Sequence, residues 1–197
     1  NVAIGFRAFQ LHTGSLNNVI IGKDSGAVIT TGSQNVAVGR DAAKALTTGG
    51  TITAIGDSAG STATTGTNNT IIGNSAAPSS VTVSNEITLG NGNISSLRCQ
   101  VTSISSLSDR RDKKDIKELP IGLNFINKLN PVEFTWNMRD GAKVGQKEAG
   151  FIAQELDEAQ QDAGVEDLMK LVLKTNPDKL EAAPGKLIPV LVKAIQE

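Results

Sequence analysis

The chain has 197 residues, a formal net charge of −1 and a sequence pI of about 5.9. This length allows one or two domains, and this charge gives no support to DNA, RNA or an anionic membrane as a partner. Aromatic residues make up only 3% of the chain, and 14 of the 20 glycines precede Ser108. We therefore expect the first half to be stabilised by regular backbone pairing and by burial between subunits rather than by large side chains.

A short motif recurs with a period of 17 residues through the first ninety residues. It first occurs at residues 1–5, so the sequence begins inside the pattern and we expect it to be a piece of a longer chain. Self-similarity at a fixed period indicates a repeat architecture. Each copy closes with a glycine, at Gly5, Gly22, Gly39, Gly56, Gly73 and Gly90.

Each repeat contains a short β-branched run, such as residues 19–21, that is typical of a strand. The glycine after it permits a turn with positive φ or a close approach of two backbones. One copy is too small to bury its apolar face, whereas stacked copies bury a continuous one. We therefore expect residues 1–107 to form a mainly β shaft, a trimeric β-solenoid or β-prism with one turn per repeat over about residues 1–90. The narrow core and scarce aromatics suggest that three chains share it.

These repeats resemble the heads of trimeric autotransporter adhesins, whose units also run Asn-x-Ala-Ile-Gly with Gly-x-x-Ala nearby. The commoner unit of those heads is shorter than the period here. The resemblance implies a rigid spacer or a receptor-facing shaft, with a host receptor or glycan as a partner and no catalysis in this half.

The shaft has few residues that could bind a metal ion. His12 is the only histidine and has no cysteine nearby, so we expect no metal site and no cofactor. Asp24, Asp41 and Asp57 follow repeat glycines and are expected to be turn residues that hydrogen-bond local backbone. A calcium ladder would need a denser Gly/Asp pattern. Cys99 is the only cysteine, which excludes an intrachain disulfide and favours a small buried or surface thiol.

The repeat loosens from residue 77 onward. Residues 81–83, 86–89 and 96–101 predict short strands that close the shaft. No apolar run reaches the ~18 residues that a membrane span needs, and no signal peptide is recognisable.

Residues 108–197 predict a small α+β domain. The apolar spacing between Pro120 and Leu129 predicts a helix that ends at Asn130 and Pro131. Strands are predicted at residues 132–136 and 148–153, with three core side chains in the first of them, namely Val132, Phe134 and Trp136.

A second helix is predicted to start at Gln154. A short apolar stretch follows at residues 168–174, then a turn at 176–179 and a final helix at 187–197. In that last helix Leu187, Leu191 and Ala194 fit an a/d seam for self-association.

The second half also carries four sequence blocks in order. They are Ser-Asp-Arg-Arg-x-Lys-Lys-x-Ile from Ser108, Leu-x-x-Ile-x-x-Leu-x-Pro-Val-x-Phe-x-Trp from Leu123, Gly-Phe-Ile-Ala-Gln-Glu from Gly150, and Leu-Ile-Pro-x-Leu-Val-Lys-Ala-Ile-Gln-Glu from Leu187. These blocks resemble the intramolecular chaperone domain of phage tailspikes and tail fibres, the peptidase S74 family. The segment at residues 180–185 departs from the resemblance, because many members carry an aromatic-containing segment there.

The resemblance implies a domain that trimerises, guides folding of the β shaft before it, and then releases itself. In the family the cut falls before the serine of a Ser-Lys dyad, and Ser108 and Lys113 match those positions, so the bond cut would join Leu107 to Ser108. Gln154 and Glu155, polar groups that follow a strand, are further site candidates, although capping of the second helix explains them equally well.

The chemistry of the boundary sets conditions on such a dyad. A serine hydroxyl needs a base, and a lysine can serve if desolvation or positive charge lowers its pKa. Positions five apart point to different faces of one regular helix. Ser108 must therefore be an N-cap or lie in the preceding extended segment, with Lys113 in or near the first turns.

We therefore interpret the chain as the distal part of a phage tail fibre or spike in the virion, assembled in the host cytoplasm as a homotrimer. Two alternatives remain open. One is a non-cleaving adhesin or fibre whose second half is a permanent trimerisation cap. The other is a membrane-tethered transcription factor processed by the same kind of domain, against which the missing basic region and membrane span weigh.

Overall fold

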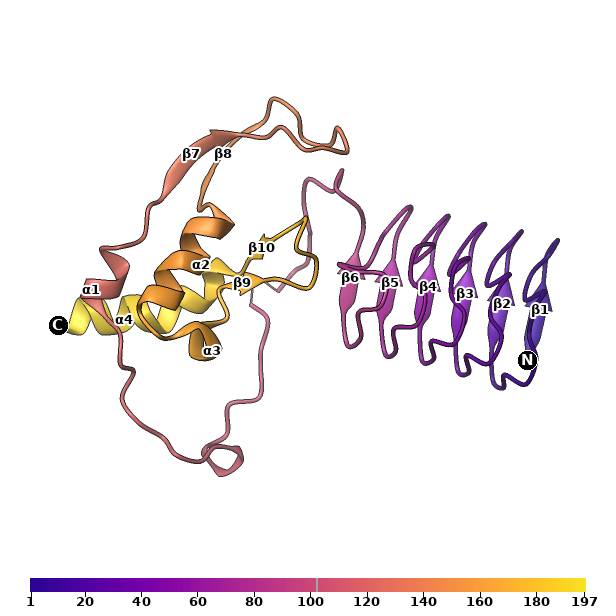
Figure 1. The fold of residues 1–197 in the computed structure, drawn as a ribbon, viewed down its shortest axis with the longest axis horizontal. Helices are drawn as coiled ribbons and strands as arrows, with labels where there is room; N and C mark the ends of the chain where they lie inside the picture. The colour runs from indigo at the N-terminus through magenta and orange to yellow at the C-terminus, as the bar shows by residue number, and fades with distance from the viewer. Residues whose placement is uncertain (102) are drawn as a thin grey trace. The chain divides into compact units, whose positions relative to one another are not determined.

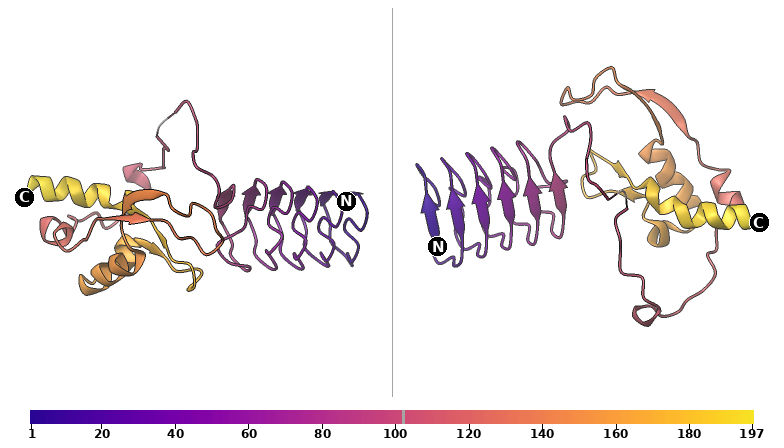
Figure 2. Two further views of the ribbon diagram at one scale, coloured as in Figure 1. Left: turned by 90° about the horizontal axis from the view of Figure 1, so that it is seen from above. Right: turned by 180° about the vertical axis from the view of Figure 1, so that it is seen from behind.

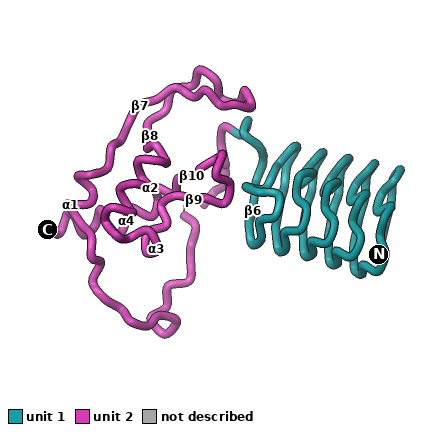
Figure 3. The backbone as a smooth tube through the Cα atoms, viewed as in Figure 1, with its two compact units in different colours: residues 1–94 teal, residues 95–197 magenta. Residues whose placement is uncertain are grey.

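The computed structural model describes residues 1–101 and 103–197. It divides into two compact units, residues 1–94 and residues 95–197 (Figure 3). Each unit has a hydrophobic core of its own. The expected domain boundary between Leu107 and Ser108 stays a prediction.

Unit 1 is a β-solenoid, as the repeat predicts. Its six strands stack in chain order as one parallel sheet, visible as a row of arrows in Figures 1 and 2. Val2 pairs with Val19 and Val19 with Val36, so the register advances by one repeat per turn. The strands are β1 (Val2–Ile4), β2 (Val19–Ile21), β3 (Val36–Val38), β4 (Thr53–Ile55), β5 (Thr70–Ile72) and β6 (Ile87–Leu89).

The solenoid core is closed within a single chain. The central residue of each inner strand points into it, and the connecting turns supply the rest, such as Ile29 and Leu46. The core described here is formed by one chain alone, and the expectation that three chains share the shaft stays a prediction. Most inward residues are small or aliphatic, such as Ala37 and Ala54, and Phe9 is the aromatic side chain of this core.

A ladder of asparagines connects successive turns inside this unit. The side-chain oxygen of Asn18 accepts the backbone N–H of Asn35 at 2.9 Å, and that of Asn35 accepts the N–H of Ile52 at 3.0 Å. The Asn35 amide group also donates to the carbonyl of Gly49 at 3.2 Å. Because an unpaired buried polar group is costly, each asparagine fixes the register of two turns.

Replacing Asn35 by alanine should destabilise the solenoid by about 3 kcal/mol, because the buried N–H of Ile52 and carbonyl of Gly49 each lose a partner. Urea unfolding followed by circular dichroism measures this. Asn74→Ala is the matched control, since Asn74 is exposed and its change should stay within about 0.5 kcal/mol. Equal losses in the two variants would contradict the ladder's role.

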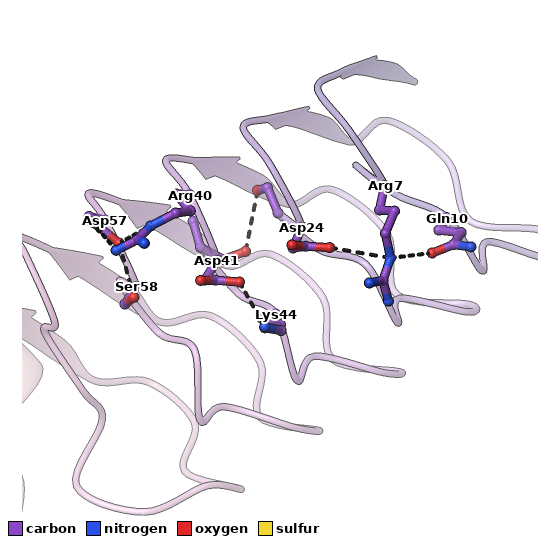
Figure 4. A network of polar contacts seen from close by, with 10 residues as sticks. Arg7, Gln10, Asp24, Arg40, Asp41, Lys44, Asp57 and Ser58 are labelled. Atoms are coloured by element: carbon purple, nitrogen blue, oxygen red, sulfur yellow. Dashed lines mark hydrogen bonds and ion pairs between the residues drawn. The ribbon is translucent and has the colours of Figure 1, made fainter.

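The three aspartates expected at turns do occupy turns, but their side chains form ion pairs with arginine or lysine side chains. Asp24 and Asp41 have φ values of 55° and 56°. Asp24 pairs with Arg7 at 3.3 Å, Asp41 with Lys44 at 2.8 Å, and Asp57 with Arg40 at 2.7 Å (Figure 4). The expected hydrogen bonds to local backbone are thus replaced by ion pairs, two of which join neighbouring turns. An exposed pair such as Arg40–Asp57 adds little stability.

The closing strands are only partly as predicted. β6 lies within residues 86–89, whereas residues 81–83 form a turn and its exit and residues 96–101 contain no strand. Residues 81–83 occupy the turn of a degenerate repeat, where Val81 accepts a hydrogen bond from Thr64.

Unit 2 is a small α+β unit. A two-stranded antiparallel ribbon and a second short pair of strands accompany four α-helices. Its elements are η1 (Arg110–Asp112), α1 (Leu123–Ile126), β7 (Val132–Thr135), β8 (Lys147–Gly150), α2 (Ala153–Asp162), α3 (Glu166–Met169), β9 (Val172–Leu173), β10 (Glu181–Ala182), η2 (Pro184–Leu187) and α4 (Ile188–Gln196).

The core of unit 2 lies between α1, α2 and α4. Phe125, Leu156 and Val190 are buried there. Gln160 is fully buried and accepts the backbone N–H of Leu171 at 2.9 Å. Burial favours a raised pKa for Asp157, but hydrogen bonds, chiefly from Lys174, outweigh it and hold the pKa below its ordinary value.

Two expectations for side chains of unit 2 are wrong. In α4, Val190 and the preceding Leu187 face the core, so the seam of Leu187, Leu191 and Ala194 does not exist as a single outward stripe. Val132, Phe134 and Trp136 are half-buried on the β7–β8 ribbon rather than in the core. The Trp136 indole instead donates to Glu148 at 2.6 Å.

Candidate active site

A single 3-10 turn, η1, separates Ser108 from Lys113. Ser108 precedes the turn, Asp109 is its N-cap and Lys113 is its C-cap. The turn folds the chain back far enough for Lys113 Nζ to lie 2.5 Å from Ser108 Oγ, with a hydrogen bond between them. The structure thus brings together the two residues of the expected dyad, and neither lies inside a regular α-helix.

Asp109 stabilises this turn. Its carboxylate accepts the backbone N–H of Arg111 at 2.8 Å and pairs with the Arg111 guanidinium at 2.7 Å. The guanidinium and then the backbone N–H hold the pKa of Asp109 below its ordinary value. Of the two positions expected for Ser108, the N-cap belongs to Asp109, and Ser108 lies directly before it, outside any helix or strand.

Sequence reasoning missed the roles of Asp109 and Arg111. Asp109 pairs with the Arg111 guanidinium, so these two charges largely offset each other beside the lysine. An aspartate directly before a turn is a common N-cap signal. The sequence contains this signal at Asp109, but Ser108, one residue earlier, is an equally good N-cap by residue type.

Ser108, Lys113 and Leu107 are all exposed in the single chain, and the Leu107 side chain is 82% exposed. The peptide bond before Ser108 is thus open to solvent on at least one side. A serine oxygen hydrogen-bonded to an amine is the arrangement needed for nucleophilic attack with proton transfer. Full activity of such a pair also requires removal of water from around it.

Gln154 and Glu155 do not join this pair. Both are exposed residues in the first turn of α2, and Glu155 accepts a hydrogen bond from Asn130 at 3.1 Å. The N-cap of α2 is Ile152, without a side-chain cap, so the expected capping role is also unsupported. Glu155 does lie where a negative charge favours a helix N-terminus.

The described cavities lie elsewhere in unit 2. A cavity of about 480 Å³ lies beside β9 and β10, and its lining does not include Ser108 or Lys113. Within residues 1–101 and 103–197, the structure has no group of three or more His, Cys, Asp or Glu side chains that could hold a metal ion. His12 is exposed and stacks on Phe9.

A comparison with known families finds a match inside unit 2. Residues 108–165 match the Peptidase_S74 family, the chaperone of endosialidase. The match begins at the serine that contacts Lys113 and ends one residue before α3. It confirms the resemblance seen in the first three sequence blocks, whereas the closing block from Leu187 lies outside it.

Beyond the Peptidase_S74 match, no curated protein and no solved structure is significantly similar to the chain. Among the described helices, none is long and apolar enough to cross a membrane.

Proposed function

We propose that residues 108–197 are an intramolecular chaperone that assists folding of the β-solenoid shaft and then cuts the chain once, between Leu107 and Ser108. One observation carries the proposal: Lys113 Nζ contacts Ser108 Oγ at 2.5 Å inside the segment that matches the Peptidase_S74 family. The protein is then a single-turnover serine endopeptidase that acts on itself.

In the proposed reaction Ser108 Oγ attacks the carbonyl carbon of Leu107 while Lys113 accepts the hydroxyl proton. The C–N bond to Ser108 breaks, the amine of Ser108 takes up that proton, and an ester joins Leu107 to the serine oxygen. Water then hydrolyses the ester, which leaves a Leu107 carboxylate and restores the Ser108 hydroxyl. Backbone N–H groups aimed at the developing oxyanion would lower the barrier.

Trimerisation is the second part of the proposal, and the outer face of α4 supports it. Four apolar side chains recur there at helical spacing and are exposed, among them Ile195 at 85%. Such a stripe is typical of helices that associate with copies of themselves. The stripe consists of Ile188, Leu191, Val192 and Ile195.

These parts fit the distal end of a phage tail fibre or spike, in which the shaft faces a host receptor or glycan. Release of the chaperone would leave a shaft that unfolds slowly and cannot easily refold, which is kinetic stability. We assign the protein to the virion on this basis.

The proposal predicts that Ser108→Ala abolishes cleavage, because the alanine has no oxygen to attack Leu107. Purified wild-type chain should give two fragments on a denaturing gel, and the variant should give one band of full length. Ser106→Ala is the control, since Ser106 is another exposed serine of the same segment and should leave cleavage unchanged.

The exposure of Ser108 and Lys113 favours a second candidate, a fibre whose second half is a permanent trimerisation cap. That candidate predicts an oligomeric but uncut wild-type chain. A wild-type chain that stays whole after folding and assembly would therefore replace the first proposal by the second.

A further inference from the structure

Lys113 contacts a serine in a segment that is rich in carboxylates. Three aspartates lie within four residues of it, at positions 109, 112 and 115. Its Nζ nevertheless donates a hydrogen bond to Ser108 Oγ at 2.5 Å, and among the described residues it forms no ion pair with these aspartates. The reaction proposed above needs the lysine on the serine, so a carboxylate that captured the lysine would oppose it.

Asp109 is well placed to be such a competitor. It directly follows Ser108 and caps the 3-10 turn whose other end is Lys113. Side chains four positions apart on a helical turn are neighbours. An opposite charge beside an amine favours the protonated amine, which has no lone pair with which to accept the serine proton. An unoccupied Asp109 carboxylate would therefore attract Lys113 and also weaken it as a base.

Arg111 occupies the Asp109 carboxylate on both oxygens. Oδ1 accepts the backbone N–H of Arg111 at 2.8 Å and its Nε–H at 3.1 Å. Oδ2 accepts the Nε–H at 3.2 Å and a terminal N–H of the guanidinium at 2.7 Å. A carboxylate offers about four lone-pair sites, so these contacts use them all. The planar guanidinium fork makes this pairing with both oxygens possible.

The other charges of the segment do not form a second pair of this kind. Within residues 108–117, which the structure describes throughout, Asp109–Arg111 is the one ion pair. The turn itself buries none of its residues. The remaining charged side chains closest in sequence to Lys113 are two cations and two anions, so their charges offset one another: Arg110, Asp112, Lys114 and Asp115.

We propose that Arg111 is a positioning residue for the self-cleavage. It occupies the Asp109 carboxylate, so that Lys113 stays on Ser108 Oγ and can accept the serine proton. The inference rests on the proposed function, because it gives Arg111 a role in the cut before Ser108. Asp109 then shapes the turn as its cap without competing for the lysine.

The full chain with Arg111→Gln tests this role. Glutamine frees the Asp109 carboxylate, so cleavage at neutral pH should slow about fivefold, the upper end of what an exposed ion pair contributes. The pH at which the rate is half-maximal should rise by about 0.7 units, the same factor expressed as a proton affinity. Arg110→Gln is the matched control, since it removes the same charge one residue earlier and outside the pair, and it should slow cleavage much less.

A double variant separates this role from a merely structural one. Asparagine is as good an N-cap as aspartate but carries no charge. Adding Asp109→Asn to Arg111→Gln should therefore restore most of the lost rate and return the half-maximal pH towards the wild-type value. A double variant that cuts no faster than Arg111→Gln would show that the pair only shapes the turn, and this overturns the proposal.

Two further results also overturn the role of Arg111. One is an Arg111→Gln chain that cuts at the wild-type rate, and the other is equal slowing by Arg111→Gln and Arg110→Gln. If the wild-type chain cuts and Ser108→Ala does not, these results leave self-cleavage standing and remove only the role of Arg111. A wild-type chain that stays whole overturns both proposals.

Discussion

Replacing Lys113 by arginine is expected to slow cleavage before Ser108 by about 10²- to 10⁴-fold, the usual contribution of a positioned general base. Arginine keeps the positive charge and can still donate a hydrogen bond to Ser108 Oγ, which lies 2.5 Å from the lysine nitrogen. It cannot give up its proton in proteins and so cannot accept one from the serine. The fraction of cut chain over time, read from denaturing gels, measures the effect.

Lys114→Arg provides the matched control for this experiment. It makes the same chemical change one residue further on, outside the contact with Ser108. Cleavage at the wild-type rate is expected in this control. If Lys113→Arg also cleaves at the wild-type rate, Lys113 is not the base, and the contact seen in the turn has only a structural role.

Replacing Gly39 by alanine is expected to destabilise the solenoid by about 3 kcal/mol or more, by combining backbone strain with overlap. Gly39 has a φ of 137°, a conformation that side-chain-bearing residues rarely adopt. An added Cβ would also overlap the carbonyl group of Gly56 in the next turn. Each turn is stabilised by its contacts with the two neighbouring turns, so a weakened contact between two turns should lower the stability of the whole stack. Urea unfolding at a fixed chain concentration measures it.

Gly14→Ala separates the two causes. Gly14 has a φ of 155°, but no atom lies within 4 Å of the position of an added Cβ. This variant should therefore lose much less stability than Gly39→Ala. If both variants unfold at the same urea concentration, close approach of the turns does not explain the repeat glycines.

The sequence was sufficient to predict the solenoid because its period is visible in the glycines. Gly22 and Gly39, spaced by one repeat, lie at equivalent positions of successive turns, each against the glycine of the next turn. Whether the core would be closed by one chain or by several could not be predicted. Alternation in a three-residue strand such as β3 says which residues share a face, but not which face is buried.

The same limit explains the error in α4. The apolar residues of this helix cover most of its circumference, so the sequence permits more than one seam. Packing on α1 decides between them, and Glu197, whose carboxylate accepts the backbone N–H of Leu123, helps to fix that packing. Such a contact joins residues 74 positions apart and leaves no local signal.

The spacing of Ser108 and Lys113 predicted that a regular helix could not contain both residues, and the 3-10 turn agrees. The pairing of Asp109 with Arg111 was not predicted, because charge counting alone does not say which aspartate meets which cation. The sequence also does not predict how water is excluded from the exposed dyad, because the groups that would cover it would belong to another part of the assembly.

Mass measurement of the purified wild-type chain, after denaturation, tests the central claim most directly. The account predicts two species, one ending with a free carboxylate at Leu107 and one beginning with a free amine at Ser108, whose masses sum to that of the intact chain plus one water. The Ser108→Ala chain should give one intact species. An uncut wild-type chain, a cut at any other bond, or the same fragments from Ser108→Ala would contradict it.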